Sequence, residues 1–415
     1  MQKKVLIKYL TLPLLALSAS SFAVETSIKG LFDVRAHYVD SNGADSYLAG
    51  DYGKFRYDDG LGVAVGQLAG QLHLDWQNNW SATVVGNLFA NRGNEKIGIT
   101  EAYFNYKGIP SEDGWRFKSK IGIFYPAISL ENVATAWSTP YSLTSSSLNN
   151  WVGEEFRNTG VNFSIEKIGR FSGSDHSFSV DLSLLQDNDP AGAMLTWHGW
   201  TIGSRQTLMQ ERLKLQHFPA RYRALSAQAG ESDPFLELDD RWGVHLAIDW
   251  KYKNIAKVNL GYYDNHAEEG VVVDGQYTWT TEFTHAGVKY KPAKQWEILA
   301  QYMAGSTYMV SPAGDRVVDN KYDNTFVMLR HYWSKHHLAF RVEHFNVEDL
   351  DSTWGDNNNE TGDAYSLAYR YQINRQNFLL TEYNFIDSNR PSRWYVGQEV
   401  DLIERQFQVG YRHYF

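Results

Sequence analysis

The chain has 415 residues, a formal net charge of −9 and no cysteine, which excludes disulfide bonds as a source of stability. It has no dense run of lysine or arginine, and this argues against a nucleic-acid surface. Mean hydropathy is low, yet 14 Trp, 26 Tyr and 21 Phe make the chain unusually aromatic. This combination favours an all-β protein, a β-barrel of the bacterial outer membrane. A soluble exported β protein that binds polysaccharide through its aromatic surface is the alternative.

Residues 1–23 are predicted to be a secretory signal peptide. Three lysines flank the start of an apolar run from Leu10 to Ala19, and Ser21 and Ala23 supply small residues for a cleavage site. The apolar run is far shorter than the about 20 residues that a membrane-spanning helix needs. We therefore expect an exported protein whose residues 24–415 form one domain.

Apolar and polar residues alternate in many segments, whereas no long stretch has a helical period. Between Trp242 and Tyr252, for example, large apolar side chains occupy the even positions and polar or small ones the odd positions. This period of two predicts strands with one apolar and one polar face. In a transmembrane barrel the apolar face contacts lipid and the polar face lines a wet lumen.

The connections between these strands are alternately short and long, as in outer-membrane barrels with short periplasmic turns and long external loops. Counting strands from Ser27 to Phe415 gives about sixteen, with both ends in the periplasm. Eighteen are possible if Met194–Ile202 and Thr207–Gln216 are also strands. The expected long loops are Val39–Gly60, Tyr125–Arg157, Asp187–Asp240, His266–Tyr277, Met309–Tyr322, Glu348–Asp363 and Asp387–Leu402.

Small residues on the second expected strand suggest a contact between subunits. Gly62, Ala64, Gly66 and Gly70 are predicted to face outward, where they would allow another subunit to approach closely. The alternative is that these glycines relieve crowding where the barrel bends. A homotrimer is the predicted assembly, with a monomer as the alternative.

The third expected loop, Tyr125–Arg157, is the candidate constriction of the lumen. Pro126 and Pro140 prevent it from continuing a strand, and a lumen enclosed by about sixteen strands is too wide for side chains alone to fill. If this loop does not narrow the lumen, Asp187–Asp240 is the next candidate. The candidate residues of the third loop are Glu131, Trp137, Tyr141, Trp151, Glu154, Glu155 and Arg157.

Basic residues on inward-facing strand positions could oppose the acids of this loop. Such an arrangement would set a transverse field that filters ions; the alternative is that the charges only pair with one another. Aromatic residues of the loop could guide sugars, although most Trp and Tyr are expected at the membrane interfaces. The candidate wall residues are Arg35, Arg116, Lys118, Lys120, Arg341 and Arg370.

The last expected strand carries a recognisable signal. Phe407, Val409 and Tyr411 share one face with Phe415, the final residue. A terminal aromatic residue after alternating apolar residues resembles the signal by which outer-membrane proteins are recognised for barrel assembly. The barrel-assembly machinery is therefore an expected partner.

Three short segments around the third loop resemble the phosphate-selective porin O and P family. They are Gly122–Pro126, Ser129–Glu131 and Arg157–Gly160, although Pro126 comes one residue earlier than in that family. The resemblance implies a sixteen-stranded trimeric porin of Gram-negative bacteria whose third loop folds into the lumen. It does not imply phosphate selectivity, because the chain has no counterpart of the family's external lysine cluster.

The sequence thus predicts an outer-membrane channel for passive diffusion of small hydrophilic solutes or ions, in contact with lipid and lipopolysaccharide. A porin specific for a sugar or an anion is the main alternative. An outer-membrane enzyme is a weaker one, because no Ser, His and polar orienting residue form a recognisable motif. No cofactor, metal or nucleic acid is expected.

Overall fold

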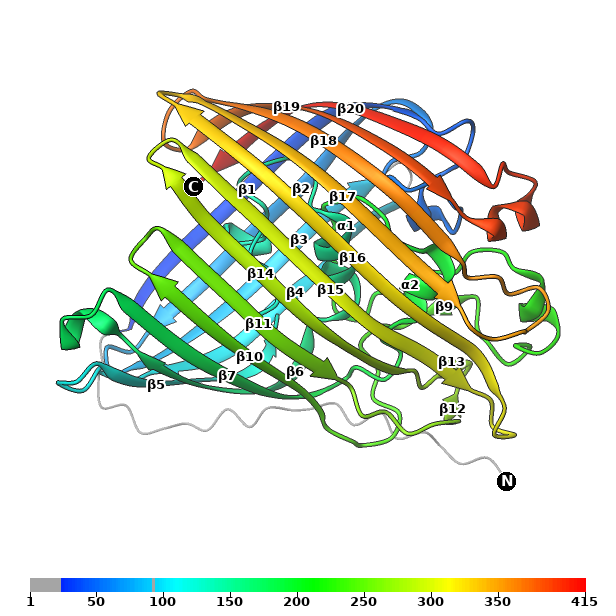
Figure 1. Cartoon of the computed structure of the whole chain (residues 1–415), viewed down its shortest axis with the longest axis horizontal. Coiled ribbons are helices and arrows are strands. Elements are labelled where there is room, and N and C mark those ends of the chain that lie inside the picture. The colour runs from blue at the N-terminus through cyan, green and yellow to red at the C-terminus, as the bar shows by residue number, and fades with distance from the viewer. Residues whose placement is uncertain (1–23, 92–93) are drawn as a thin grey trace.

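A closed barrel of sixteen antiparallel strands dominates the structure (Figure 1). The computed structural model describes residues 24–91 and 94–415, so the predicted signal peptide, residues 1–23, lies outside the described residues. The first strand, β1 (Glu25–Asp40), closes the barrel by pairing with the last, β20 (Asp401–Tyr414). The others are β2 (Gly60–Asp75), β3 (Trp80–Asn91), β4 (Asn94–Lys107), β5 (Trp115–Phe124), β6 (Asn158–Lys167), β7 (His176–Gln186), β10 (Gly243–Tyr252), β11 (Ala256–Asp264), β14 (Thr280–Ala293), β15 (Trp296–Val310), β16 (Arg316–Trp333), β17 (His336–Asp349), β18 (Glu360–Gln372) and β19 (Asn377–Asn389).

The alternation in the sequence becomes the two faces of the barrel wall. On β10, Leu246 and Ile248 point outward and are 41% and 48% exposed, whereas His245 and Ala247 point inward and are buried. The same alternation recurs on the other strands, so a large apolar surface covers the outside of the barrel. Such a surface is far larger than the apolar patches of soluble proteins.

Short turns connect the strands at one end of the barrel, which we call the turn end, and most connections at the loop end are long. The long ones are loop 1 (41–59), loop 3 (125–157), loop 4 (187–242), loop 5 (265–279), loop 7 (350–359) and loop 8 (390–400). Sixteen strands are confirmed, and the eighteen-strand alternative is wrong because Met194–Ile202 contributes a helix, α2 (Ala193–His198), instead of a strand.

One expected long loop is not a loop. Only residues 311–315 separate β15 from β16, and Ser311 donates its amide to Asp315 O in a tight turn. Most of Met309–Tyr322 therefore extends two paired strands. Its polar residues suggested a loop, but on β16 they lie on both faces of the strand: Asn320 is buried, whereas Arg316 and Lys321 are exposed.

The expected outward row of small residues on β2 is wrong at three of its four positions. A Cβ atom on Gly62 would lie 2.4 Å from His37 Nε2, and one on Gly66 would lie 2.5 Å from Arg35 Nε, so both glycines face the lumen. Ala64 packs against the interior cluster. Only Gly70 opens onto free space. The reason is a bulge opposite Asp33 and Val34, which shifts the register of β2 and reverses its parity.

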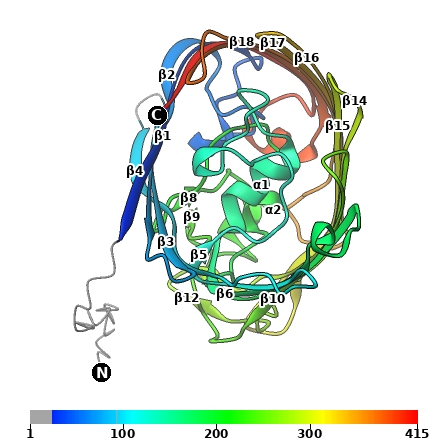
Figure 2. The same cartoon turned by 90° about the vertical axis from the view of Figure 1, so that its left-hand side faces the viewer.

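Two helices lie inside the ring of strands rather than outside it (Figure 2). They are α1 (Ser147–Glu155), in loop 3, and α2, in loop 4. None of the helices in the described parts of the chain is long and apolar enough to cross a bilayer. Loops 4 and 5 also form two small hairpins, β8 (Leu213–Lys214) with β9 (Glu231–Ser232) and β12 (Val272–Val273) with β13 (Gln276–Tyr277). Short 3-10 turns lie at η1 (Tyr47–Ala49), η2 (Thr135–Trp137), η3 (Gly169–Ser172), η4 (Pro219–Tyr222) and η5 (Pro391–Val396).

Candidate functional site

Loop 3 fills the middle of the lumen. It turns inward after β5 at Pro126, and every residue from Tyr141 to Arg157 is buried. Leu148 and Phe156 belong to a large buried cluster that includes wall residues such as Phe283 on β14 and Met303 on β15. The loop is therefore held by an apolar core inside the barrel, which fits the inward constriction predicted from the sequence.

The first turn of α1 is held by carboxylates. Ser146 caps the helix by accepting a hydrogen bond from Asn149 N at 3.3 Å. Glu131 accepts bonds from Ser146 N at 2.9 Å and Ser146 Oγ at 2.7 Å, and Glu343 on β17 accepts bonds from the amide and hydroxyl of Ser147, both at 2.7 Å. Carboxylates near a helix N-terminus are favoured by its free amides and dipole. The run of hydroxyl residues at 144–147 thus supplies donors that attach the loop to the wall.

Arg341 on β17 joins these two carboxylates. Its guanidinium lies 3.0 Å from Glu131 and 2.7 Å from Glu343, and it donates to the carbonyl oxygens of Thr144 and Ser145 at 3.0 and 3.1 Å. All three charged side chains are at most 1% exposed. Glu131 and Arg341 form a buried ion pair, as in the alternative in which these charges pair with one another.

The last turn of α1 connects loop 3 to loop 4. Glu155 accepts hydrogen bonds from the backbone amides of Gly192 and Met194, each at 3.1 Å, at the start of α2. It also accepts one from Trp151 Nε1 at 2.5 Å. Burial raises the pKa of Glu155 to about 7, and these donors oppose the shift. Residues 188–203 of loop 4 are all buried, so this loop also occupies the lumen.

Other loop residues predicted for the constriction pack in the same interior. Glu154 lies 3.4 Å from His198 on α2, and Arg157 lies over the ring of Phe235, 4.2 Å from its centre. Trp137 is half-buried and stacks on Tyr125 with ring centres 4.2 Å apart. Trp151 meets Trp200 edge to face at 5.4 Å. These aromatic rings contact one another, which does not favour a row of free rings along a sugar path.

Two more networks of buried ion pairs lie inside the barrel, one near β1 and one beneath loop 8. In the first, Arg35 and Arg412 both contact Asp33, at 2.6 and 2.7 Å. In the second, Lys54 of loop 1 pairs with Glu360, which Arg390 also contacts at 3.3 Å. Burying charges is costly unless each one has partners, and these networks supply them.

The lumen wall near the turn end carries half-buried basic residues. On β5, Arg116 and Lys118 share one carboxylate, Glu166, and their side chains are 21% and 30% exposed. Lys120, further along β5, lies 5.0 Å from the ring centre of Tyr103.

A second basic group lies on the wall around the tip of loop 3. Lys289, Lys291 and Arg330 share Glu297, with the two lysines at 3.4 and 3.8 Å. Lys289 also donates to the hydroxyl of Tyr141 at 2.9 Å. Arg370 on β18 donates to the carbonyl of Pro140 at 2.7 Å. Basic side chains therefore outnumber the single carboxylate in this second group, whereas Lys120 of the first group also lies near Glu101 and Asp181.

A cavity of about 700 Å³ opens on the loop-end side of β2. It is bordered by loop 1, the first residues of β2, Lys96 of β4 and part of loop 4. Arg205 and Glu211 pair on its wall, and His37 stacks on Tyr57 with ring centres 3.9 Å apart.

All the predicted loop and wall residues lie in the lumen or on its wall, but most of them pair with groups that the sequence did not identify. Asp33, Glu343 and Glu382 occupy inward positions that strand alternation alone could have revealed. The partners on loop 4 had no such signal, because a loop has no fixed period.

Comparisons with known proteins show the same architecture. The chain is similar to OmpT, an outer membrane protein of Vibrio cholerae in its trimer form, with 10% identity, a TM-score of 0.52, and coverage of 95% of this chain and 100% of that one. It is similar to an anion-selective porin from Comamonas acidovorans, with 12% identity, a TM-score of 0.54, and coverage of 94% and 100%. It is also similar to the outer membrane channel DcaP of Acinetobacter baumannii, with 10% identity, a TM-score of 0.54, and coverage of 95% and 99%.

No family model and no curated protein matches the chain. Identities this low show the fold alone, which is the porin barrel. The resemblance to the phosphate-selective porin O and P family is not confirmed by these comparisons.

Proposed function

We propose that this chain is a porin of the Gram-negative outer membrane, a channel through which small hydrophilic solutes or ions diffuse passively. The observation that carries the proposal is a closed sixteen-stranded barrel that is apolar outside, polar and charged inside, and narrowed by two inward loops. An apolar outer face suits lipid, and a polar lumen suits water. The short turns then face the periplasm, and the long loops face the outside and its lipopolysaccharide.

The solute path is proposed to run along the side of β2 to β5. Loop 3 places most of its apolar side chains against β14 to β19, including Phe283 and Phe326. The cavity of about 700 Å³ is bordered by the first residues of β2, and Lys120 of β5 lies beside Tyr103 of β4. Loops 3 and 4 together form the constriction in this proposal, with the buried Glu131–Arg341 pair as a structural element that holds loop 3 against the wall.

The excess of basic groups supports a preference for small anions. Five cations share two carboxylates, Glu166 and Glu297, near the periplasmic turns. Charges on a pore wall attract counterions and set selectivity. The similar porin from Comamonas acidovorans is described as anion-selective, which agrees with this preference.

Recordings in planar lipid bilayers test the channel. We expect stepwise conductance, a reversal potential that shifts toward anions in a salt gradient, and passage of small sugars in liposome swelling. A barrel that conducts nothing and releases fatty acid from phospholipid would instead be an enzyme. A protein that stays soluble and monodisperse without detergent would contradict the membrane assignment.

A homotrimer is the proposed assembly. The first residues of β2 expose Leu61 and Val63 by 83% and 76%, more than the other outward residues of that strand, such as Leu68 at 41%. A contact between subunits would cover these side chains. Chemical cross-linking in mild detergent should give a trimer band, and a monomer band alone would refute the assembly. The replacement of Leu61 by Ser should weaken the trimer, whereas the replacement of Ile403 on β20 by Ser serves as an outward-facing control.

A further inference from the structure

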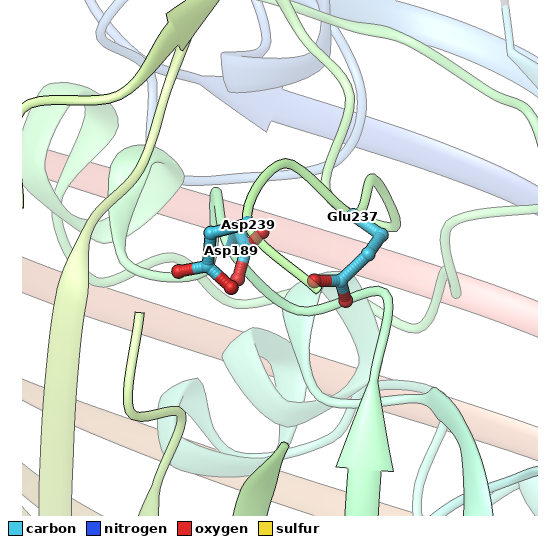
Figure 3. A group of neighbouring side chains, drawn as sticks. All are labelled: Asp189, Glu237 and Asp239. Atoms are coloured by element: carbon cyan, nitrogen blue, oxygen red, sulfur yellow. The ribbon is translucent and has the colours of Figure 1, made fainter. Parts of the chain in front are cut away.

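Three carboxylates from the two ends of loop 4 meet at one place. Asp189 follows β7, whereas Glu237 and Asp239 precede β10. Figure 3 shows the three side chains turned toward one another, and one oxygen from each lies within 4.8 Å of the others. The barrel brings these residues together because β7 and β10 are neighbours in the wall.

The burial of Asp189 is the feature that indicates a bound ligand. Its side chain is fully buried, and within the described part of the chain its Oδ1 atom has no hydrogen-bond donor. The Oε1 atom of Glu237 is also buried and, among the described residues, also without a donor. A buried carboxylate oxygen without a partner costs free energy that a bound cation or proton can offset.

Among the residues that the structure describes, no ion pair joins a cation to any of the three carboxylates. Leu238 donates its backbone amide to Oδ2 of Asp189, the other oxygen of that carboxylate. Arg241, which is close in sequence, pairs with Glu268 at 3.1 Å. Its backbone amide donates to Asp239 at 2.7 Å, and the amide of Asp187 donates to Glu237 at 2.9 Å. These backbone donors fix the carboxylates in place without neutralising them.

We propose that Asp189, Glu237 and Asp239 bind a calcium ion that joins the two ends of loop 4. Calcium binds carboxylate oxygens at about 2.4 Å, so ligands on opposite sides of the ion are about 4.8 Å apart. The three oxygens lie within that separation without any movement. Magnesium needs about 2.1 Å and near-ideal octahedral geometry, whereas calcium accepts the more variable geometry that carboxylates from two separate loop segments provide. Glu237 and Asp239 are only half-buried, which leaves room for water to complete the coordination shell.

The site lies where it can control loop 4. The segment between Asp189 and Glu237 includes α2, whose start is bonded to Glu155 of loop 3. An ion that joins both ends of this segment fixes the base of the loop that carries α2 into the lumen. Removal of the ion leaves three carboxylates in mutual repulsion at that base.

Terbium luminescence tests the site directly. The full-length protein is refolded in neutral detergent without lipopolysaccharide, treated with EDTA and desalted, then titrated with Tb³⁺ while tryptophan is excited. Trp279 donates its amide to the backbone oxygen of Asp189 at 2.8 Å, so its indole is close enough to sensitise a bound ion. We expect a saturable signal that Ca²⁺ displaces at lower concentration than Mg²⁺.

Substitutions locate the ion. Asp189→Asn should abolish the luminescence signal, and Asp239→Asn should weaken Tb³⁺ binding at least tenfold. If the Asp189→Asn variant does not fold, the variant at the half-buried Asp239 tests the site. Asp240→Asn removes the same charge from an exposed neighbour and should bind like the wild type. Absence of a saturable signal in the wild type, or its retention in the Asp239→Asn variant, would overturn the proposal. This readout is independent of conductance, so it can fail while the porin assignment holds.

Discussion

Replacing Glu131 by glutamine tests whether the buried ion pair fixes loop 3 in the lumen. Glu131 accepts bonds from Ser146 N at 2.9 Å, from Asn149 Nδ2 at 2.9 Å and from Arg341 at 3.0 Å, and it is fully buried. Glutamine keeps the shape of the side chain but removes the charge and turns one acceptor into a donor. The change thus affects the attachment of loop 3 without altering its backbone.

The expected magnitude follows from what Arg341 retains. Removing one partner of a buried ion pair costs about 3–5 kcal/mol, because the other charge stays buried and unpaired. Here Arg341 keeps Glu343 at 2.7 Å and two carbonyl oxygens, so we expect a cost near the lower end, about 3 kcal/mol. A difference of about 3 kcal/mol is roughly a 150-fold change in the equilibrium for local opening.

Hydrogen–deuterium exchange followed by mass spectrometry measures this opening. The amides of Ser146 and Ser147 are protected by Glu131 and Glu343, so peptides that contain them should exchange roughly 100-fold faster in the variant. Peptides from the barrel strands should exchange as in the wild type. Glu166→Gln is the matched control, because Glu166 lies on β6, outside loop 3, and pairs with Arg116 and Lys118 on the wall.

Two results would refute the reasoning. Acceleration of less than about tenfold in loop 3 would mean that the apolar core of the loop, not the ion pair, holds it. Equal acceleration in strands and loop would mean that the substitution destabilises the whole barrel.

Three further perturbations probe the lumen and the outer loops. Lys120→Glu should move the reversal potential toward cations, because the ammonium lies on the lumen wall 5.0 Å from the ring of Tyr103; an unchanged potential would place the path elsewhere. Deleting Ala134–Asn149 should raise single-channel conductance, and an assembled barrel with unchanged conductance would assign the narrowest section to loop 4. Burial, with Asp351 next in importance, raises the pKa of Asp356 in loop 7 to about 8. Above about pH 4 the Asp356 carboxyl group keeps its proton in the folded protein but has lost it in the unfolded chain. The free energy of unfolding should therefore fall as pH rises from about 4 to 8. Asp356→Asn should reduce the difference between pH 5 and pH 9 in the temperature at which gel mobility changes, and an undiminished difference would contradict this.

Much of the barrel could be predicted because each strand repeats a local rule. A period of two needs no knowledge of distant residues, so the number of strands and the inward faces of β5 and β17 are confirmed. The rule failed on β2, where one bulge reverses the parity of Gly62 and Gly66. A bulge depends on the partner strand, and the sequence of one strand does not reveal it.

The interior was harder to predict because its partners are distant in sequence. The inward course of loop 3 follows from its prolines and length, but the pairing of Glu131 with Arg341 depends on where β17 lies in the closed barrel. Loop 4 gave no periodic signal, and the carboxylates at its two ends match no motif spacing. Only the pairing of β7 with β10 brings Asp189 close to Glu237.

The contact between α1 and α2 means that the two inward loops move as one unit. Glu155 belongs to loop 3, yet it accepts the first amides of α2 in loop 4, so neither helix can leave its place without breaking bonds of the other. Fluctuations of such a unit are concerted. A current record should therefore show a single shared transition between two levels, not the independent steps of two separate gates.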